Sequence, residues 1–120
     1  IKQSYPGHAK QAGMLAANCR AGNYAGRWVI VVDDDIDPAD MQSVIWAMST
    51  RCDPVEDIDF IRRAWSTPLD PMLPHAPYES NRAVVNACKP WDRLKSFPIT
   101  AEASPELRAR IKGKWPELFT

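Results

Sequence analysis

The sequence is poor in cysteine and glycine and carries no excess charge of either sign. Its 120 residues include three cysteines and five glycines, and 15 basic residues balance 15 acidic ones. Cys19, Cys52 and Cys88 lie far apart without a Cys-x-x-Cys pair, which argues against a disulfide framework or a zinc site and predicts reduced thiols. The zero net charge argues against a nucleic-acid-binding protein, which would show a basic excess or patch.

Long apolar runs and targeting segments are also missing. No stretch approaches the roughly 20 apolar residues of a transmembrane helix, and we find neither a signal peptide nor an arginine-rich transit segment. We therefore expect a cytoplasmic protein without a membrane span, formed by one domain that can bury a core. Eleven prolines, most of them after residue 53, predict long ordered loops in the second half.

The most informative segment joins an apolar strand, an acidic loop and a helix. Trp28–Val32 is a continuous apolar run rich in β-branched residues, typical of a strand covered on both faces. Five aspartates follow it, at positions 33, 34, 35, 37 and 40. This order places polar groups at the carboxyl edge of an α/β sheet, where such folds usually bind ligands.

The helix after the aspartates has a clear predicted start. Asp37 fits the N-cap, Pro38 the first helical position, and Asp40 the third, facing the cap. Apolar residues then recur at helical spacing and predict a buried stripe: Met41, Val44, Ile45 and Met48.

Local patterns predict the remaining elements. We expect a helix over 8–20, a turn over 21–26, a short strand over 57–64, a proline-rich loop over 66–81, a strand over 82–89 and a C-terminal helix over 104–119. Small residues recur along the first of these helices, at Ala9, Ala12 and Ala16, so it should lie close to another backbone. The predicted fold class is α/β, a small mostly parallel sheet flanked by helices, with a long proline-rich loop and a C-terminal helix.

The aspartates allow a metal-binding interpretation and a structural one. Asp-x-Asp-x-Asp at 33–37 opens like a calcium loop, but Pro38 stands where that loop needs glycine and Val44 where it needs glutamate. A magnesium-dependent phosphoryl-transfer site would need a further acidic pair and a lysine on later loops, which we do not find. In the structural interpretation, Asp37 and Asp40 cap the helix and the other aspartates are solvated.

Other polar residues give weaker signals. Lys2, Tyr5 and His8 lie on a loop that leads into a helix start, where a lysine and helix amides could hold a phosphate. His75 fits an ordinary surface residue. Arg51 could pair with an anion, although interaction with its own helix dipole is the simpler account. These residues make no complete set of nucleophile, base and orienting group.

Several segments resemble the C-terminal region of the UbiD family of reversible decarboxylases. They are Ile1–Gln11 with Gly-His-Ala-Lys, Val29–Pro38 with Val-Asp-Asp-Asp-Ile-Asp, Val44–Arg51 with Trp-Ala-x-x-Thr-Arg, Asp53-Pro54 and Asn86–Pro90. The resemblance implies that residues 1–120 are the C-terminal domain of a protein several times longer. Members of the family use prenylated flavin mononucleotide to decarboxylate aromatic or α,β-unsaturated acids.

The resemblance also implies roles for single residues. The family's catalytic Glu-Arg-Glu/Asp set, and the ligands of the metal beside the flavin phosphate, belong to the preceding central domain. No catalytic residue and no metal ligand is therefore carried over to this chain. Lys2 matches a lysine that approaches the flavin, and Tyr5 and His8 match positions near the cofactor and substrate pocket. Met48 and Thr50 match pocket-wall positions that touch the substrate ring.

The same resemblance implies partners. They are an aromatic carboxylic acid as substrate, a flavin prenyltransferase as supplier of the cofactor, and further copies of the protein. A divalent metal and a monovalent cation would be held by the missing domain. Residues 104–119, with Trp115 and Phe119, resemble a helix that packs on a partner subunit. Two other classes stay open: a non-catalytic oligomerisation or regulatory module, and a magnesium-dependent phosphoryl-transfer domain on the loop from Asp33 to Asp35.

Overall fold

A three-stranded sheet with the strand order β1-β3-β2 forms the centre of the structure. The structure is a computed structural model that describes residues 1–73 and 75–119. Its elements are α1 (His8–Asn18), α2 (Arg20–Ala25), β1 (Trp28–Val32), α3 (Met41–Arg51), β2 (Ile58–Trp65), β3 (Glu79–Ala87), α4 (Pro105–Lys114) and two short 3₁₀ turns, η1 (Trp91–Arg93) and η2 (Pro116–Phe119).

The α/β class predicted from the sequence is confirmed, but the sheet is mixed rather than mostly parallel. β1 pairs with β3 in parallel, whereas β2 pairs with β3 in an antiparallel direction. The physical reason is the direct loop between β2 and β3, which turns the chain back on itself, as only antiparallel neighbours allow.

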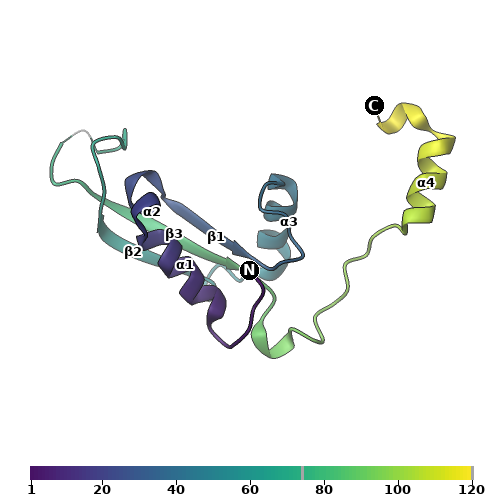
Figure 1. Cartoon of the computed structure of the whole chain (residues 1–120), viewed down its shortest axis with the longest axis horizontal. Coiled ribbons are helices and arrows are strands. Elements are labelled where there is room, and N and C mark those ends of the chain that lie inside the picture. Colours follow the sequence, from purple (N-terminus) through teal and green to yellow (C-terminus); the bar gives the residue numbers. More distant parts are fainter. Residues whose placement is uncertain (74, 120) are drawn as a thin grey trace.

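Helices α1 and α3 cover opposite faces of the sheet (Figure 1). Successive side chains of β1 point to opposite faces, so neighbouring residues of this strand contact different helices. Val31 packs with Ala9 of α1. Its neighbour Val32 packs with Val44 and Ala47 of α3. The carboxyl end of β1 is therefore held between two helices, and the loop that leaves it starts from a fixed position.

Helix α1 approaches the sheet closely, as its small residues predict. Its buried residues are Ala9, Gly13 and Ala17. A Cβ atom on Gly13 would lie 2.4 Å from a methyl carbon of Val84 and 3.0 Å from one of Val31. The approach therefore depends on glycine at this position. The other two alanines named from the sequence, at 12 and 16, are not among the buried residues of the helix.

Helix α3 begins later than the sequence predicts. Its N-cap is Asp40, which accepts hydrogen bonds from the backbone nitrogen of Gln42 at 3.0 Å and the hydroxyl of Ser43 at 2.5 Å. Asp37, the predicted cap, instead accepts from the backbone nitrogen of Ala39 at 2.9 Å in the preceding turn. The Asp-Pro-Ala-Asp sequence offers two capping carboxylates, and the second one satisfies the first helical donors.

The predicted apolar stripe of α3 is also displaced. Met41 and Ile45 are 63% and 51% exposed, so they do not belong to the core. The buried residues of the helix are Val44, Ala47 and Arg51. The small Ala47 allows the close approach, and Arg51 continues the buried row because its charge is neutralised, as described below.

Two further boundaries differ from the sequence-based expectation. Residues 20–25 form the short helix α2 rather than a turn, with the sulfur of Cys19 accepting from the backbone nitrogen of Gly22 at its start. Strand β3 begins at Glu79, so the proline-rich loop ends at residue 78, because Glu79 pairs with the end of β2. Pro74 of this loop lies outside the described residues. The predicted strand over 57–64 is confirmed as β2.

Helix α4 stands away from the sheet at the end of an extended segment (Figure 1). Ser104 caps it by accepting from the backbone nitrogen of Leu107 at 3.2 Å, and none of the residues in α4 is buried. The predicted C-terminal helix is confirmed over Pro105–Lys114, and the short turn η2 follows it. In the described part of the chain, no helix combines the length and the apolarity that a membrane crossing requires.

Candidate functional site

The carboxylate of Asp33 joins three separate segments at the carboxyl edge of the sheet. It accepts hydrogen bonds from the side-chain amide of Gln3 at 2.8 Å, the backbone nitrogen of Lys89 at 2.7 Å and the guanidinium of Arg51 at 3.3 Å. Gln3 precedes α1, Arg51 ends α3 and Lys89 follows β3. A residue that is 4% exposed thus fixes the relative positions of these three segments.

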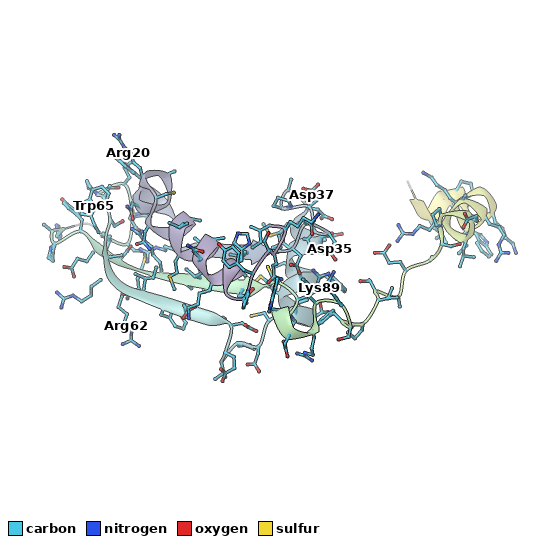
Figure 2. The ribbon with its side chains drawn as sticks, turned by 60° about the horizontal axis from the view of Figure 1, so that its bottom comes forward. Arg20, Asp35, Asp37, Arg62, Trp65 and Lys89 are labelled. Atoms are coloured by element: carbon cyan, nitrogen blue, oxygen red, sulfur yellow. The ribbon has the colours of Figure 1, made fainter. Side chains whose placement is uncertain are left out.

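Asp35 extends this arrangement toward the surface. Arg51 donates two parallel hydrogen bonds to its carboxylate, at 2.8 and 2.9 Å, and the ammonium of Lys89 donates a third at 2.6 Å. The hydrogen bond from Arg51, with a smaller contribution from Lys89, holds the pKa of Asp35 well below its usual range. Figure 2 shows Asp35 and Lys89 near one another at one end of the sheet, far from Trp65 at the other end.

We call Gln3, Asp33, Asp35, Arg51 and Lys89 the carboxyl-edge network. Its two carboxylates and two cations balance in charge. The guanidinium of Arg51 also lies over the ring of Trp46, 5.2 Å from the ring centroid. The hydrogen bond to Asp35 raises the pKa of Arg51, so the cation persists at any physiological pH.

The network corrects two expectations from the sequence. Asp33 and Asp35 are paired rather than solvated, whereas the neighbouring Asp34 is exposed as expected. Arg51 pairs with these carboxylates instead of acting only on its own helix dipole. The position of Arg51 in the sequence could have predicted this pairing. Arg51 lies seven residues after Val44, on the buried row of α3, where a charge requires a partner.

The acidic loop binds the protein's own cations in this structure. Within residues 1–73 and 75–119, no three His, Cys, Asp or Glu side chains gather in a way that could hold a metal ion. The oxygens of Asp33 and Asp35 instead accept from the nitrogen donors of the network.

The first group of predicted site residues lies on one ordered segment. The ring of Tyr5 stacks on the imidazole of His8, with centroids 4.3 Å apart and planes inclined by 19°. The backbone nitrogen of Ser4 donates to Nδ1 of His8 at 3.2 Å, and the hydroxyl of Tyr5 donates to Gln11 at 2.6 Å. Lys2 is exposed, and its ammonium has no partner among the described residues. The segment therefore carries an ordered aromatic pair and an exposed lysine.

The second group lies on α3. Met48 is partly buried against the cluster around Val32, and Thr50 is exposed and donates to the carbonyl of Trp46 at 2.9 Å. Thr50 also lines a hollow of about 540 Å³ together with Cys52. The residues of the first group and Met48 do not line that hollow. Both groups are thus connected to Asp33, the first through Gln3 and the second through Arg51.

The cysteine thiols and His75 lie outside these two groups of residues. The three cysteines are free thiols. Burial, and next the charge of Asp33, raise the pKa of the Cys88 thiol to about 12, and burial also raises the pKa of Cys52. Both thiols are therefore protonated at neutral pH and poor nucleophiles. His75 is exposed, as predicted for a surface residue.

The region that holds the mixed sheet and its acidic loop matches the C-terminal domain of a family of carboxy-lyases. Residues 1–87 match the family described as 3-octaprenyl-4-hydroxybenzoate carboxy-lyase, C-terminal domain. This match covers the sheet, its flanking helices and the loop with the aspartates. The chain belongs to the UbiD family.

Relatives of known sequence or structure agree with this assignment. A protein of Aeropyrum pernix is 31% identical over 119 residues, which are 98% of this chain and 24% of that protein. Vanillic acid decarboxylase of Sedimentibacter hydroxybenzoicus, in its closed form, is 27% identical with a TM-score of 0.71, over 100% of this chain and 25% of its own. The UbiD-class enzyme HmfF of Pelotomaculum thermopropionicum, in complex with FMN, is 27% identical with a TM-score of 0.74, over 91% of this chain and 23% of its own. The chain thus spans about a quarter of the length of these relatives.

Proposed function

We propose that this chain is the C-terminal domain of a reversible, non-oxidative decarboxylase of aromatic or α,β-unsaturated carboxylic acids that uses prenylated FMN. The observation that carries the proposal is the similarity to a vanillic acid decarboxylase over the whole chain. The FMN bound to the UbiD-class enzyme HmfF supports the flavin cofactor. The catalytic acid and base, and the metal ligands, then belong to another part of the polypeptide.

Within that function, the segment before α1 supplies one part of the pocket wall. The exposed ammonium of Lys2 is suited to an anionic group of the cofactor, since it has no other partner in the described structure. The stacked pair of Tyr5 and His8, on the same segment, offers a flat aromatic surface. These groups suit a planar anionic ligand. When bound, prenylated FMN supplies an electron sink, and the residues of this chain bind, orient and exclude water.

Helix α3 supplies the other part of the wall. The flexible thioether of Met48 and the hydroxyl of Thr50 are suited to contact and orient an aromatic ring. Both parts of the wall are tied to Asp33, through Gln3 and Arg51. We therefore expect residues 1–8 and 48–51 to move as one unit when the pocket opens or closes.

Helix α4 is suited to a contact between subunits of a homo-oligomer. Its residues are all unburied in the single chain, and Trp115 and Leu118 beyond it are 42% and 71% exposed. The side chain of Phe119, named with Trp115 from the sequence, lies outside the described part. An exposed terminal helix followed by large apolar residues is suited to pack on a neighbouring protomer.

The test is the intact mass of the native gene product, measured with its visible absorption spectrum after co-expression with a flavin prenyltransferase. We expect a chain about four times longer, a flavin band, and release of CO₂ from aromatic acids. A native chain of this length without a chromophore would leave the non-catalytic oligomerisation module.

A matched pair of variants tests the cofactor contact. Lys2→Met should weaken flavin binding at least several-fold, because it removes the free ammonium. Lys10→Met removes a surface lysine of the same region, whose ammonium pairs with Asp59 at 2.8 Å. Its flavin affinity should equal that of the unmodified protein. Equal affinities for both variants would remove Lys2 from the cofactor site.

A further inference from the structure

Gln3 is the one partly buried residue in the otherwise exposed segment 1–7. Its side-chain nitrogen donates to Oδ1 of Asp33 at 2.8 Å and to the carbonyl of Lys89 at 2.9 Å. Asp33 follows β1, and Lys89 follows β3, the neighbouring strand of the sheet. A single amide group therefore connects the segment to the ends of two strands.

The two partners of Gln3 are both acceptors, so this contact requires a group with two hydrogens to donate. The amide nitrogen of glutamine has two, and the side chain carries no charge that would compete with Asp33 for Arg51. Oδ2 of Asp33 accepts from Arg51 and from the backbone nitrogen of Lys89. Gln3 thus uses the carboxylate oxygen that these donors leave free, and the charge of the carboxylate strengthens the hydrogen bond.

The rest of the segment is held by α1 rather than by the sheet. The hydroxyl of Tyr5 donates to Gln11, and the backbone nitrogen of Ser4 donates to Nδ1 of His8. Both acceptors belong to α1. The segment is therefore attached at two places, to α1 and, through Gln3, to the carboxyl edge of the sheet.

Lys2 lies directly beside the attachment at the sheet edge. Adjacent Cα atoms are about 3.8 Å apart, so a fixed Gln3 restricts the backbone of Lys2 and the space that its exposed ammonium can reach. The nitrogen of Ile1 adds a backbone contact, to the carbonyl of Val32 at 2.6 Å. Among the described residues, Gln3 is the one member of segment 1–7 whose side chain hydrogen-bonds to this edge.

We propose that Gln3 is a positioning residue whose amide holds Lys2 where its ammonium meets the anionic group of the cofactor. This role rests on the function proposed above, in which Lys2 contacts prenylated FMN. Both donors of the Gln3 amide are used by Asp33 and Lys89, so Gln3 acts through Lys2. It restricts the segment before the flavin binds, and less conformational freedom is then lost on binding.

The affinity for FMN, measured by quenching of flavin fluorescence in the native gene product prepared without flavin, tests this role. Gln3→Met keeps the length of the side chain but removes both donors. We expect binding to weaken about tenfold, as for the loss of one charge-assisted hydrogen bond. Gln42→Met makes the same change on α3, at an exposed side chain without a hydrogen bond in the described structure, and should leave the affinity unchanged. Equal affinities for the two variants would overturn the proposal.

A double variant separates positioning from a general loss of structure. In a Lys2→Met background, the ammonium that Gln3 places is gone, so adding Gln3→Met should weaken FMN binding little further. The same loss in both backgrounds would mean that Gln3 does not act through Lys2, and the proposal would be wrong.

Gln3→Glu gives a pH profile that a loss of packing would not produce. The glutamate has the shape of glutamine, but in its ionised form it places acceptors against Asp33 and the carbonyl of Lys89. In its protonated form it donates again, so FMN binding should recover toward acid pH in Gln3→Glu and not in Gln3→Met. The other titratable and charged groups around Asp33 are Asp35, Arg51, Cys88 and the ammonium of Lys89.

The unmodified protein, measured at each pH, is the reference for the titration of these groups and of His8. A Gln3→Glu protein that binds FMN as tightly as the unmodified protein at neutral pH would show that the two donors are not needed. That result would also overturn the proposal.

Hydrogen exchange followed by mass spectrometry examines the attachment without any flavin. In Gln3→Met, the peptide that spans residues 1–7 should exchange faster, while the peptide that contains β3 keeps its rate. Unchanged exchange in both peptides would show that Gln3 does not hold the segment. An unmodified protein that binds no FMN would instead contradict the proposed function, so the two failures are distinguishable.

Discussion

Asp33 and Arg51 form an ion pair inside the protein, with 3.3 Å between Oδ2 and Nη1 and side-chain exposures of 5% and 2%. A pair at this depth loses hydration on both sides, so it contributes more to position than to net stability. Here the position is that of α3 relative to β1. Through the amide of Gln3, the same carboxylate also places the segment before α1.

Arg51→Ala should lower the free energy of unfolding by about 3 kcal/mol, because the carboxylate of Asp33 would stay buried without its cation. Urea denaturation followed by tryptophan fluorescence measures the loss. Arg63→Ala is the matched control, since it removes an arginine from an ion pair with Glu79 in which the Arg63 side chain is 80% exposed. The control should change stability far less. Equal losses would show that the buried pair has no special role.

Asp35→Asn should make the protein less sensitive to acid. The hydrogen bond from Arg51 holds the pKa of Asp35 well below its usual range, so the folded state keeps a carboxylate that the unfolded chain protonates near pH 4. The stability that the Asp35 carboxylate contributes is fully present above its pKa in the unfolded chain. It is lost as the pH falls toward the lower pKa of Asp35 in the folded protein. Urea midpoints between pH 7 and about 2.5 should therefore fall less steeply in Asp35→Asn. Asp34→Asn, which removes an exposed carboxylate from the same loop, is the matched control.

Asp40→Ala should lower the melting temperature more than Asp37→Ala. Asp40 satisfies the first donors of α3, whereas Asp37 closes only the turn before it. Asp40→Asn retains a capping oxygen and should recover most of the loss. Thermal unfolding by circular dichroism compares the three variants, and a larger effect at Asp37 would restore the helix start expected from the sequence.

Gly13→Ala should destabilise the packing of α1 by about 1–3 kcal/mol, because the new methyl group would lie 2.4 Å from a methyl carbon of Val84. Gly113→Ala makes the same change in α4, where nothing lies within 4 Å of the added carbon. That control should raise helicity, since alanine favours a helix by up to about 1 kcal/mol over glycine. A Gly13→Ala protein as stable as the control would mean that α1 can move away from the sheet.

Local sequence patterns predicted the elements that form from local interactions. The β-branched run of β1 and the alternation in β2 gave strands at the right places. The start of α3 was misplaced because Asp37 and Asp40 are chemically equivalent caps. Asp40 also accepts a hydrogen bond from the hydroxyl of Ser43, which favours it as the cap. The antiparallel direction of β2 could not be read from its sequence, since pairing depends on how the following loop returns.

The candidate site was predicted unevenly. Lys2, Tyr5 and His8 share a segment, as their spacing required, and the stacking of the last two is a local contact that the sequence analysis did not predict. The carboxyl-edge network was missed because its members come from residues 3, 33, 35, 51 and 89, too far apart for any local pattern. The roles of Met48 and Thr50 derive from the family resemblance and stay predictions.

The tethered position of α4 has a consequence for assembly. Residues 98–104 form neither helix nor strand, and a chain of that length reaches at most about 25 Å. A docking surface within that radius meets α4 at an effective concentration of roughly the millimolar range. A contact too weak to join two separate molecules would then be occupied most of the time, and the helix could dissociate and rebind without the assembly coming apart.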